Sequence, residues 1–106
     1  MRIRKPLSID DPDILFIAKV AEALAHPVRV SILKYVLESN EVRNDICNSD
    51  LVSTFPYSQA TLSQHVKKLK EADLFHIEQQ DRFSMYRVNT DTLDRYSTLL
   101  KLRRFK

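Results

Sequence analysis

The sequence contains no glycine, no tryptophan and a single cysteine, Cys47, among 106 residues. The common nucleotide-binding loops need glycine at fixed positions, so its absence excludes them. One cysteine excludes an internal disulfide and a cysteine-rich structural zinc site, and it favours a reducing compartment. No apolar run approaches the roughly 20 residues of a membrane-spanning helix, and the basic residues 1–8 lack the apolar stretch of a signal peptide. We therefore expect a cytoplasmic protein with no membrane segment.

Positive charge is concentrated at the two ends of the chain. The formal net charge is +3, but residues 1–10 hold three basic side chains against one acidic, and residues 82–106 hold seven against two. Basic ends can bind nucleic acid, and they can equally serve solubility alone, so charge does not decide the function. The length fits a single domain spanning residues 1–106.

The spacing of apolar residues predicts four helices, then a β-hairpin, then a last helix. The first helix follows the capping residues 8–13 and ends near Ala25, and the second starts at Pro27 with His26 as its cap. The remaining predicted elements are helices at 44–54 and 59–72, a hairpin at 75–88 with a polar tip at 79–82, and a last helix after a cap at 89–91 that carries Leu93, Tyr96, Leu99, Leu100 and Phe105. This order predicts a mainly α fold with a small β-hairpin, a winged helix-turn-helix.

The predicted helix 59–72 has one apolar and one polar face. Leu62, Val66 and Leu69 fall on one side at 100° per residue, which leaves the other side free to touch a partner. In a winged helix-turn-helix this helix enters a DNA major groove, where short polar side chains can reach base edges. The candidate base-contacting residues are Gln59, Thr61, Ser63 and Gln64.

Lys67 and Lys68 follow on the same helix and are placed to contact phosphates, which provide affinity without sequence information. At the tip of the hairpin, Arg82 could reach a phosphate or a narrow minor groove. The alternative is a winged helix that docks a protein through the same polar face and does not bind DNA. No paired nucleophile and base stands out, so we do not expect an enzyme.

The first and last predicted helices carry apolar residues for which a monomer of this size offers little further core to pack against. These residues are Ile14, Ile17, Leu93, Tyr96, Leu99 and Leu100. A twofold homodimer would bury them, and it would require a pseudo-palindromic DNA site with half-sites about one helical turn apart.

Three segments resemble the ArsR-type winged-helix repressors: ALAHPVRVSIL at 23–33, SQATLSQHVKKLKEADL at 58–74 and YRV at 86–88. The resemblance spans about residues 14–100. It implies a homodimeric transcriptional repressor whose first and last helices form the dimer interface. It also implies a set of DNA-facing residues: Ser58, Gln59, Thr61, Ser63, Gln64 and His65.

The sequence departs from this family at the positions where many members sense metals. Those members use a Cys-x-Cys-Asp motif at the start of the third helix, or Asp and His residues on the last helix. Here residues 42–45 read Val-Arg-Asn-Asp, and residues 90–106 contain no histidine. We therefore expect no metal and no cofactor, and a small-molecule inducer of unknown identity stays possible.

Two further residues allow two interpretations each. Cys47 falls on the apolar side of the predicted helix 44–54, where it would be a buried, inert thiol or a sensor of oxidants. His65 lies about 60° from the buried direction of its helix, where it could pack against the preceding helix or bond a DNA phosphate.

Overall fold

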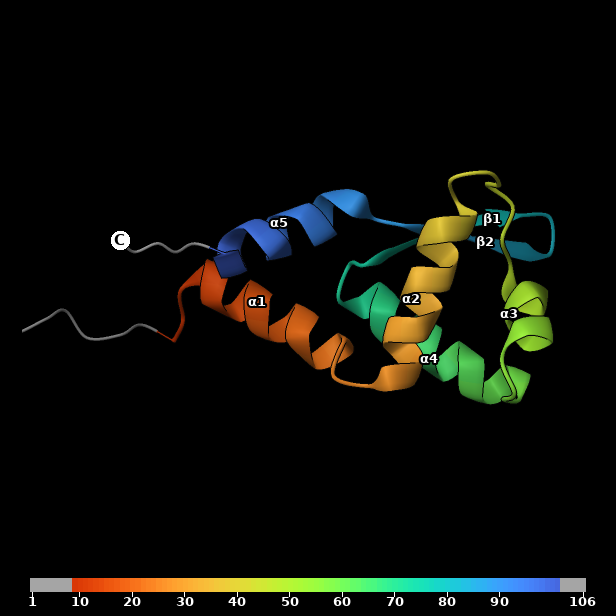
Figure 1. The fold of residues 1–106 in the computed structure, drawn as a ribbon, viewed down its shortest axis with the longest axis horizontal. Coiled ribbons are helices and arrows are strands. Elements are labelled where there is room, and N and C mark those ends of the chain that lie inside the picture. Colours follow the sequence, from red (N-terminus) through yellow and green to blue (C-terminus); the bar gives the residue numbers. More distant parts are fainter. Residues whose placement is uncertain (1–8, 102–106) are drawn as a thin grey trace, which may run out of the picture.

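The elements follow one another in the predicted order (Figure 1). A computed structural model describes residues 9–101; Phe105 and the basic residues Arg2, Arg4, Lys5, Arg103, Arg104 and Lys106 lie outside this range. The helices are α1 (Pro12–Ala23), α2 (Pro27–Ser39), α3 (Asn48–Thr54), α4 (Gln59–Glu71) and α5 (Thr90–Lys101), and the strands are β1 (Phe75–Gln80) and β2 (Phe83–Val88). The predicted class, a mainly helical winged helix-turn-helix with one antiparallel hairpin, is confirmed.

Proline fixes the start of the first two helices. Pro12 and Pro27 occupy first helical positions, where the missing N–H has no helical partner to lose. Before Pro12, a carboxylate oxygen of Asp11 accepts the backbone N–H of Asp13 at 2.8 Å. His26 is the cap of α2, as predicted; its backbone is extended and its side chain makes no capping hydrogen bond.

Aspartate takes the left-handed backbone positions that glycine would usually fill. Asp73 has φ 62° just after α4, and Asp81 has φ 58° at the two-residue tip of the hairpin. The turn at Asp73 lets the N–H of Leu74 donate to the carbonyl of Leu69 at 2.9 Å, which closes the end of α4. A chain without glycine therefore still makes both tight turns.

The third helix is shorter than its apolar pattern indicated. It begins at Asn48, so the prediction that residues 44–47 are helical is wrong. Ile46 is buried in the non-helical segment before α3, and its carbonyl accepts the N–H of Tyr86 at 2.7 Å. Cys47 is the half-buried cap of α3, with its N–H donating to Asp50 Oδ2 at 2.9 Å. The expectation that Cys47 lies on an apolar helix face is also wrong.

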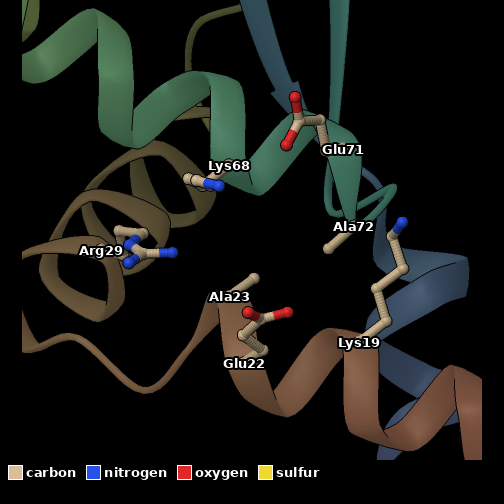
Figure 2. A pocket seen from close by; sticks show the side chains of 7 residues that line it. All are labelled: Lys19, Glu22, Ala23, Arg29, Lys68, Glu71 and Ala72. Atoms are coloured by element: carbon tan, nitrogen blue, oxygen red, sulfur yellow. The ribbon is translucent and has the colours of Figure 1, made fainter.

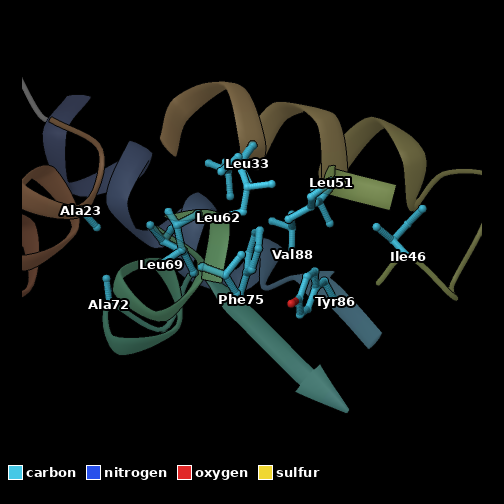
Figure 3. Packing of buried hydrophobic residues seen from close by; sticks show 14 of the residues in the cluster. Ala23, Leu33, Ile46, Leu51, Leu62, Leu69, Ala72, Phe75, Tyr86 and Val88 are labelled. Carbon is cyan, nitrogen blue, oxygen red and sulfur yellow. The ribbon is translucent and has the colours of Figure 1, made fainter. Parts of the chain in front are cut away.

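The core lies between α2, α3, α4 and the hairpin (Figure 3). From α4 it receives Leu62, Val66 and Leu69, none more than 3% exposed. Ile32, Leu33, Val36, Ile46, Leu51, Leu74, Phe75, Tyr86 and Val88 surround them, and α1 adds Val20 and Ala23. The apolar face of α4 is therefore held against the core.

Helices α1 and α5 lie side by side at the end of the molecule opposite α3 and the hairpin (Figure 1). Arg95 of α5 joins them, since its Nη2 lies 3.0 Å from Asp13 Oδ1 and its guanidinium lies 4.0 Å from the centre of the Phe16 ring. Leu93 and Tyr96 are half-buried and pack against the core, so α5 covers more core than its sequence suggested.

Asn40, just after α2, connects that helix to β2. Its side-chain Oδ1 accepts the N–H of Val88 at 3.0 Å, and its Nδ2 donates to the carbonyl of Tyr86 at 3.3 Å. The same Nδ2 lies 3.4 Å from the carbonyl of Arg43. The one side-chain amide of Asn40 therefore hydrogen-bonds backbone groups of β2 and of the loop after α2.

Replacing Asn40 by alanine should lower the free energy of unfolding by about 1–3 kcal/mol, because partly buried backbone groups of β2 lose their partners. Urea unfolding measures this change. Asn44→Ala, at an exposed position four residues later, is the matched control and should change stability little. Equal effects of the two substitutions would contradict the role of Asn40.

Candidate nucleic-acid interface

The outer face of α4 is polar and exposed along its whole length. The predicted residues that lie there or at its cap, all exposed, are Ser58, Gln59, Thr61, Ser63, Gln64, Lys67 and Lys68. Leu62, Val66 and Leu69 point the opposite way, into the core. The amphipathic pattern therefore predicted the correct free face.

The first turn of α4 is held by Ser58 and Thr61. Ser58 Oγ accepts the N–H of Thr61 at 3.2 Å and donates to Thr61 Oγ1 at 3.1 Å, so Ser58 is the cap of α4. Within residues 9–101, the side chains of Gln59, Ser63 and Gln64 make no hydrogen bonds. Their donors and acceptors are available to a partner.

The hairpin tip lies next to the beginning of α4. Gln59 and Ser63 line a hollow of about 300 Å³ together with Arg82 and Phe83. Arg82 is exposed in the two-residue turn between the strands. The structure thus brings together the helix residues and the hairpin arginine that were singled out separately in the sequence.

Phe83 is a candidate contact that the sequence analysis missed. Its side chain is 55% exposed, an unusual position for a phenylalanine. Because side chains alternate along a strand, it faces away from the side of β2 that buries Tyr86 and Val88. This alternation with respect to Tyr86 is the sequence signal that could have identified it.

Lys67 and Lys68 diverge, although they are adjacent on α4. Both are exposed, but Lys68 lies toward Arg29 of α2 and lines a cavity with it (Figure 2). Lys67 does not line that cavity, so it is the better candidate of the two for a phosphate contact.

His65 is placed against the beginning of α2. Its ring centre lies 4.6 Å from that of His26, and the rings are tilted by 56°. The Nδ1 atom of His26 is buried without a hydrogen-bond partner in the described part of the chain. Burial, and then electrostatic interactions with His26 and Arg29, lower the pKa of His65 below its ordinary value. A contact between His65 and DNA stays a prediction.

Neither a metal centre nor a membrane span is found among residues 9–101. No three or more His, Cys, Asp or Glu side chains gather there as a metal site would require. No helix in this range is long and apolar enough to cross a bilayer.

The fold is a winged helix-turn-helix with an exposed polar face on α4, and comparison with known proteins identifies its family. Residues 26–75 match the family described as "Bacterial regulatory protein, arsR family". The arsenical resistance operon repressor of Staphylococcus xylosus is 32% identical over 78 residues, which are 74% of this chain and 70% of that protein. The chain belongs to the ArsR family of transcriptional regulators, as its motifs indicated, and not to a family of enzymes.

Solved structures show the same fold. The ArsR-like transcriptional regulator from Rhodococcus sp. RHA1 superposes with a TM-score of 0.71 at 23% identity, over 82% of this chain and 77% of that one. NolR from Sinorhizobium fredii superposes with a TM-score of 0.68 at 24% identity, over 92% and 93% of the two chains.

The lowered pKa of His65 predicts a pH-dependent stability. The unfolded chain takes up a proton at this ring near the ordinary pKa of 6.5, and the folded chain does so only at lower pH. The free energy of unfolding should therefore fall as the pH drops below about 6.5, and His65→Gln should reduce this fall. Urea unfolding at about pH 7.5 and about pH 5 measures both.

His76→Gln is the control, because His76 is exposed on β1 away from this pair. Its pH dependence should resemble that of the wild type. The interpretation is contradicted if His65→Gln retains the full pH dependence.

Proposed function

We propose that this chain is a homodimeric repressor that places α4 of each subunit in successive major grooves of a pseudo-palindromic operator. The observation that carries the proposal is the exposed face of α4 with the unbonded side chains of Gln59, Ser63 and Gln64. A glutamine amide can bond an adenine edge with two hydrogen bonds, and a serine hydroxyl can bond any base. By family membership we expect the double-stranded operator to be the partner, in the cytoplasm.

Cationic side chains around this face suit the phosphate backbone. Lys67 and Lys68 lie on α4, and Arg82 lines the same hollow as Gln59. Contacts to phosphates on both sides of the groove would fix the orientation of the helix, while the glutamines read the sequence. The exposed ring of Phe83 could pack on the sugar backbone beside Arg82.

The dimer is supported by the apolar surface of the paired helices α1 and α5. Ile14 is 45% exposed and Leu100 is 56% exposed, while Ile17 and Leu99 are half-buried. A twofold contact through this surface would cover these side chains and leave the outer face of α4, and the hairpin at the other end of the molecule, free for DNA.

The second candidate, a module that docks a protein through the polar face of α4, is separated from the first by salt dependence. Binding to DNA releases counterions from phosphates, so the affinity falls steeply with salt. A protein partner recognised through amides and hydroxyls would show no such slope.

Replacing Lys67 by alanine should flatten the plot of log affinity against log salt by about one unit, because one phosphate contact is lost. Fluorescence anisotropy with a labelled mixed-sequence duplex measures the slope. Lys34→Ala removes an exposed cation from α2 and is the control that should keep the wild-type slope. A wild-type protein without a salt slope would overturn DNA binding and favour the protein-docking module.

Replacing Leu100 by arginine should convert the dimer to a monomer, because a charge would be buried in the apolar interface. Light scattering at micromolar concentration measures the mass. Val42→Arg makes the same change at a side chain that is 84% exposed in the loop after α2, and it should remain a dimer. A monomeric wild type would show that the interface is wrong.

A further inference from the structure

A cavity of about 260 Å³ lies on the side of α4 that faces α1 and α2 (Figure 2). Five charged side chains line it: Lys19 and Glu22 of α1, Arg29 of α2, and Lys68 and Glu71 of α4. Ala23 and Ala72, both buried, complete the wall and leave the space open because their side chains are short. The cavity is smaller than the roughly 300–1,000 Å³ of pockets for drug-sized ligands, so it suits a small metabolite.

The charges around this cavity do not pair with one another. None of the five forms an ion pair within 4.0 Å with another residue in the range 9–101. The Nε atom of Arg29 is buried and has no hydrogen-bond partner in that range. Native proteins rarely leave such groups without partners, so the unpaired charges that line this cavity favour a charged partner from outside the chain.

The arrangement of signs specifies the chemistry of that partner. Figure 2 shows Arg29 and Lys68 on one side of the cavity, Lys19 on the other, and Glu22 and Glu71 on opposite walls between them. Three cations and two carboxylates give the lining a formal charge of +1. A ligand with two carboxylates flanking one ammonium group would match each of these charges and balance the total.

We propose that the cavity binds an acidic amino acid that acts as an effector of DNA binding. Its α-carboxylate lies between Arg29, whose planar guanidinium suits a carboxylate, and Lys68. Its ammonium group lies between Glu22 and Glu71, and its second carboxylate meets Lys19.

The effector role rests on the proposed function, because it requires that α4 binds DNA. Lys68 belongs both to the cavity and to the predicted phosphate contacts. A carboxylate bound to Lys68 neutralises a charge that DNA would otherwise use, and the ligand also joins α4 to α1 and α2. Ligand binding therefore lowers the affinity for DNA.

Binding is tested on the full chain without DNA, by calorimetric titration with L-glutamate and L-aspartate. L-Glutamine lacks the second carboxylate and glutarate lacks the ammonium group, so each should bind at least about tenfold more weakly than L-glutamate. Glutarate that binds as tightly as L-glutamate would overturn the proposal, and so would the absence of binding by both acidic amino acids.

Variants assign the contacts. Arg29→Ala should weaken L-glutamate binding at least about tenfold, while Lys34→Ala, which removes a cation elsewhere on α2, should leave it unchanged. Should Arg29→Ala fail to fold, Glu22→Gln at an exposed position of α1 gives an independent test, since it should weaken binding of L-glutamate but not of glutarate. Wild-type binding by the folded variants would overturn the site.

The effector role is tested by DNA affinity at constant ionic strength, with and without saturating L-glutamate. We expect the affinity for DNA to fall at least about fivefold in the wild type and to fall less in Glu22→Gln at the same L-glutamate concentration. Unchanged affinity in the wild type would overturn the effector role. DNA binding without glutamate tests the proposed function alone, and glutamate binding without DNA tests the cavity alone, so the two failures are distinguishable.

Discussion

Burial of one face of α4 is the constraint on which the candidate interface depends. Leu62 and Leu69 are fully buried and Val66 is nearly so. Full burial of each such side chain contributes about 1.5–3 kcal/mol, more than a typical net hydrogen bond of about 1 kcal/mol. The apolar residues therefore decide how the helix is rotated, and the polar residues between them must face outward.

The same core also fixes where the hairpin lies relative to α4. The backbone bond between Ile46 and Tyr86 and the side chain of Asn40 hold β2 against the segments that flank α3 and end α2. β1 follows α4 after the turn at Asp73, so the strands run back alongside the core and their tip reaches the hollow beside Gln59. The buried core and these hydrogen bonds contact no ligand themselves, but they determine that the hairpin tip lies beside Gln59.

Local patterns predicted the parts of this fold that local physics determines. The start of α2 at Pro27 with His26 as its cap, the amphipathic period of α4 and the alternation of the strands each depend on near neighbours, and each was predicted correctly. The start of α3 was predicted wrongly, because Ile46 lies outside the helix and its carbonyl accepts the backbone N–H of Tyr86, forty residues later. The pairing of His65 with His26 and the cavity beside Arg29 likewise join residues from different helices. No spacing along the chain encodes such contacts.

The central claim is that two copies of α4, held by one dimer, read two halves of one DNA site. Selection of bound duplexes from a random pool, followed by sequencing, tests this claim most directly. The account predicts an enriched inverted repeat whose half-site centres lie about 10–10.5 base pairs, or one helical turn, apart. A pool that yields no enriched motif, or a single motif without twofold symmetry, would contradict it.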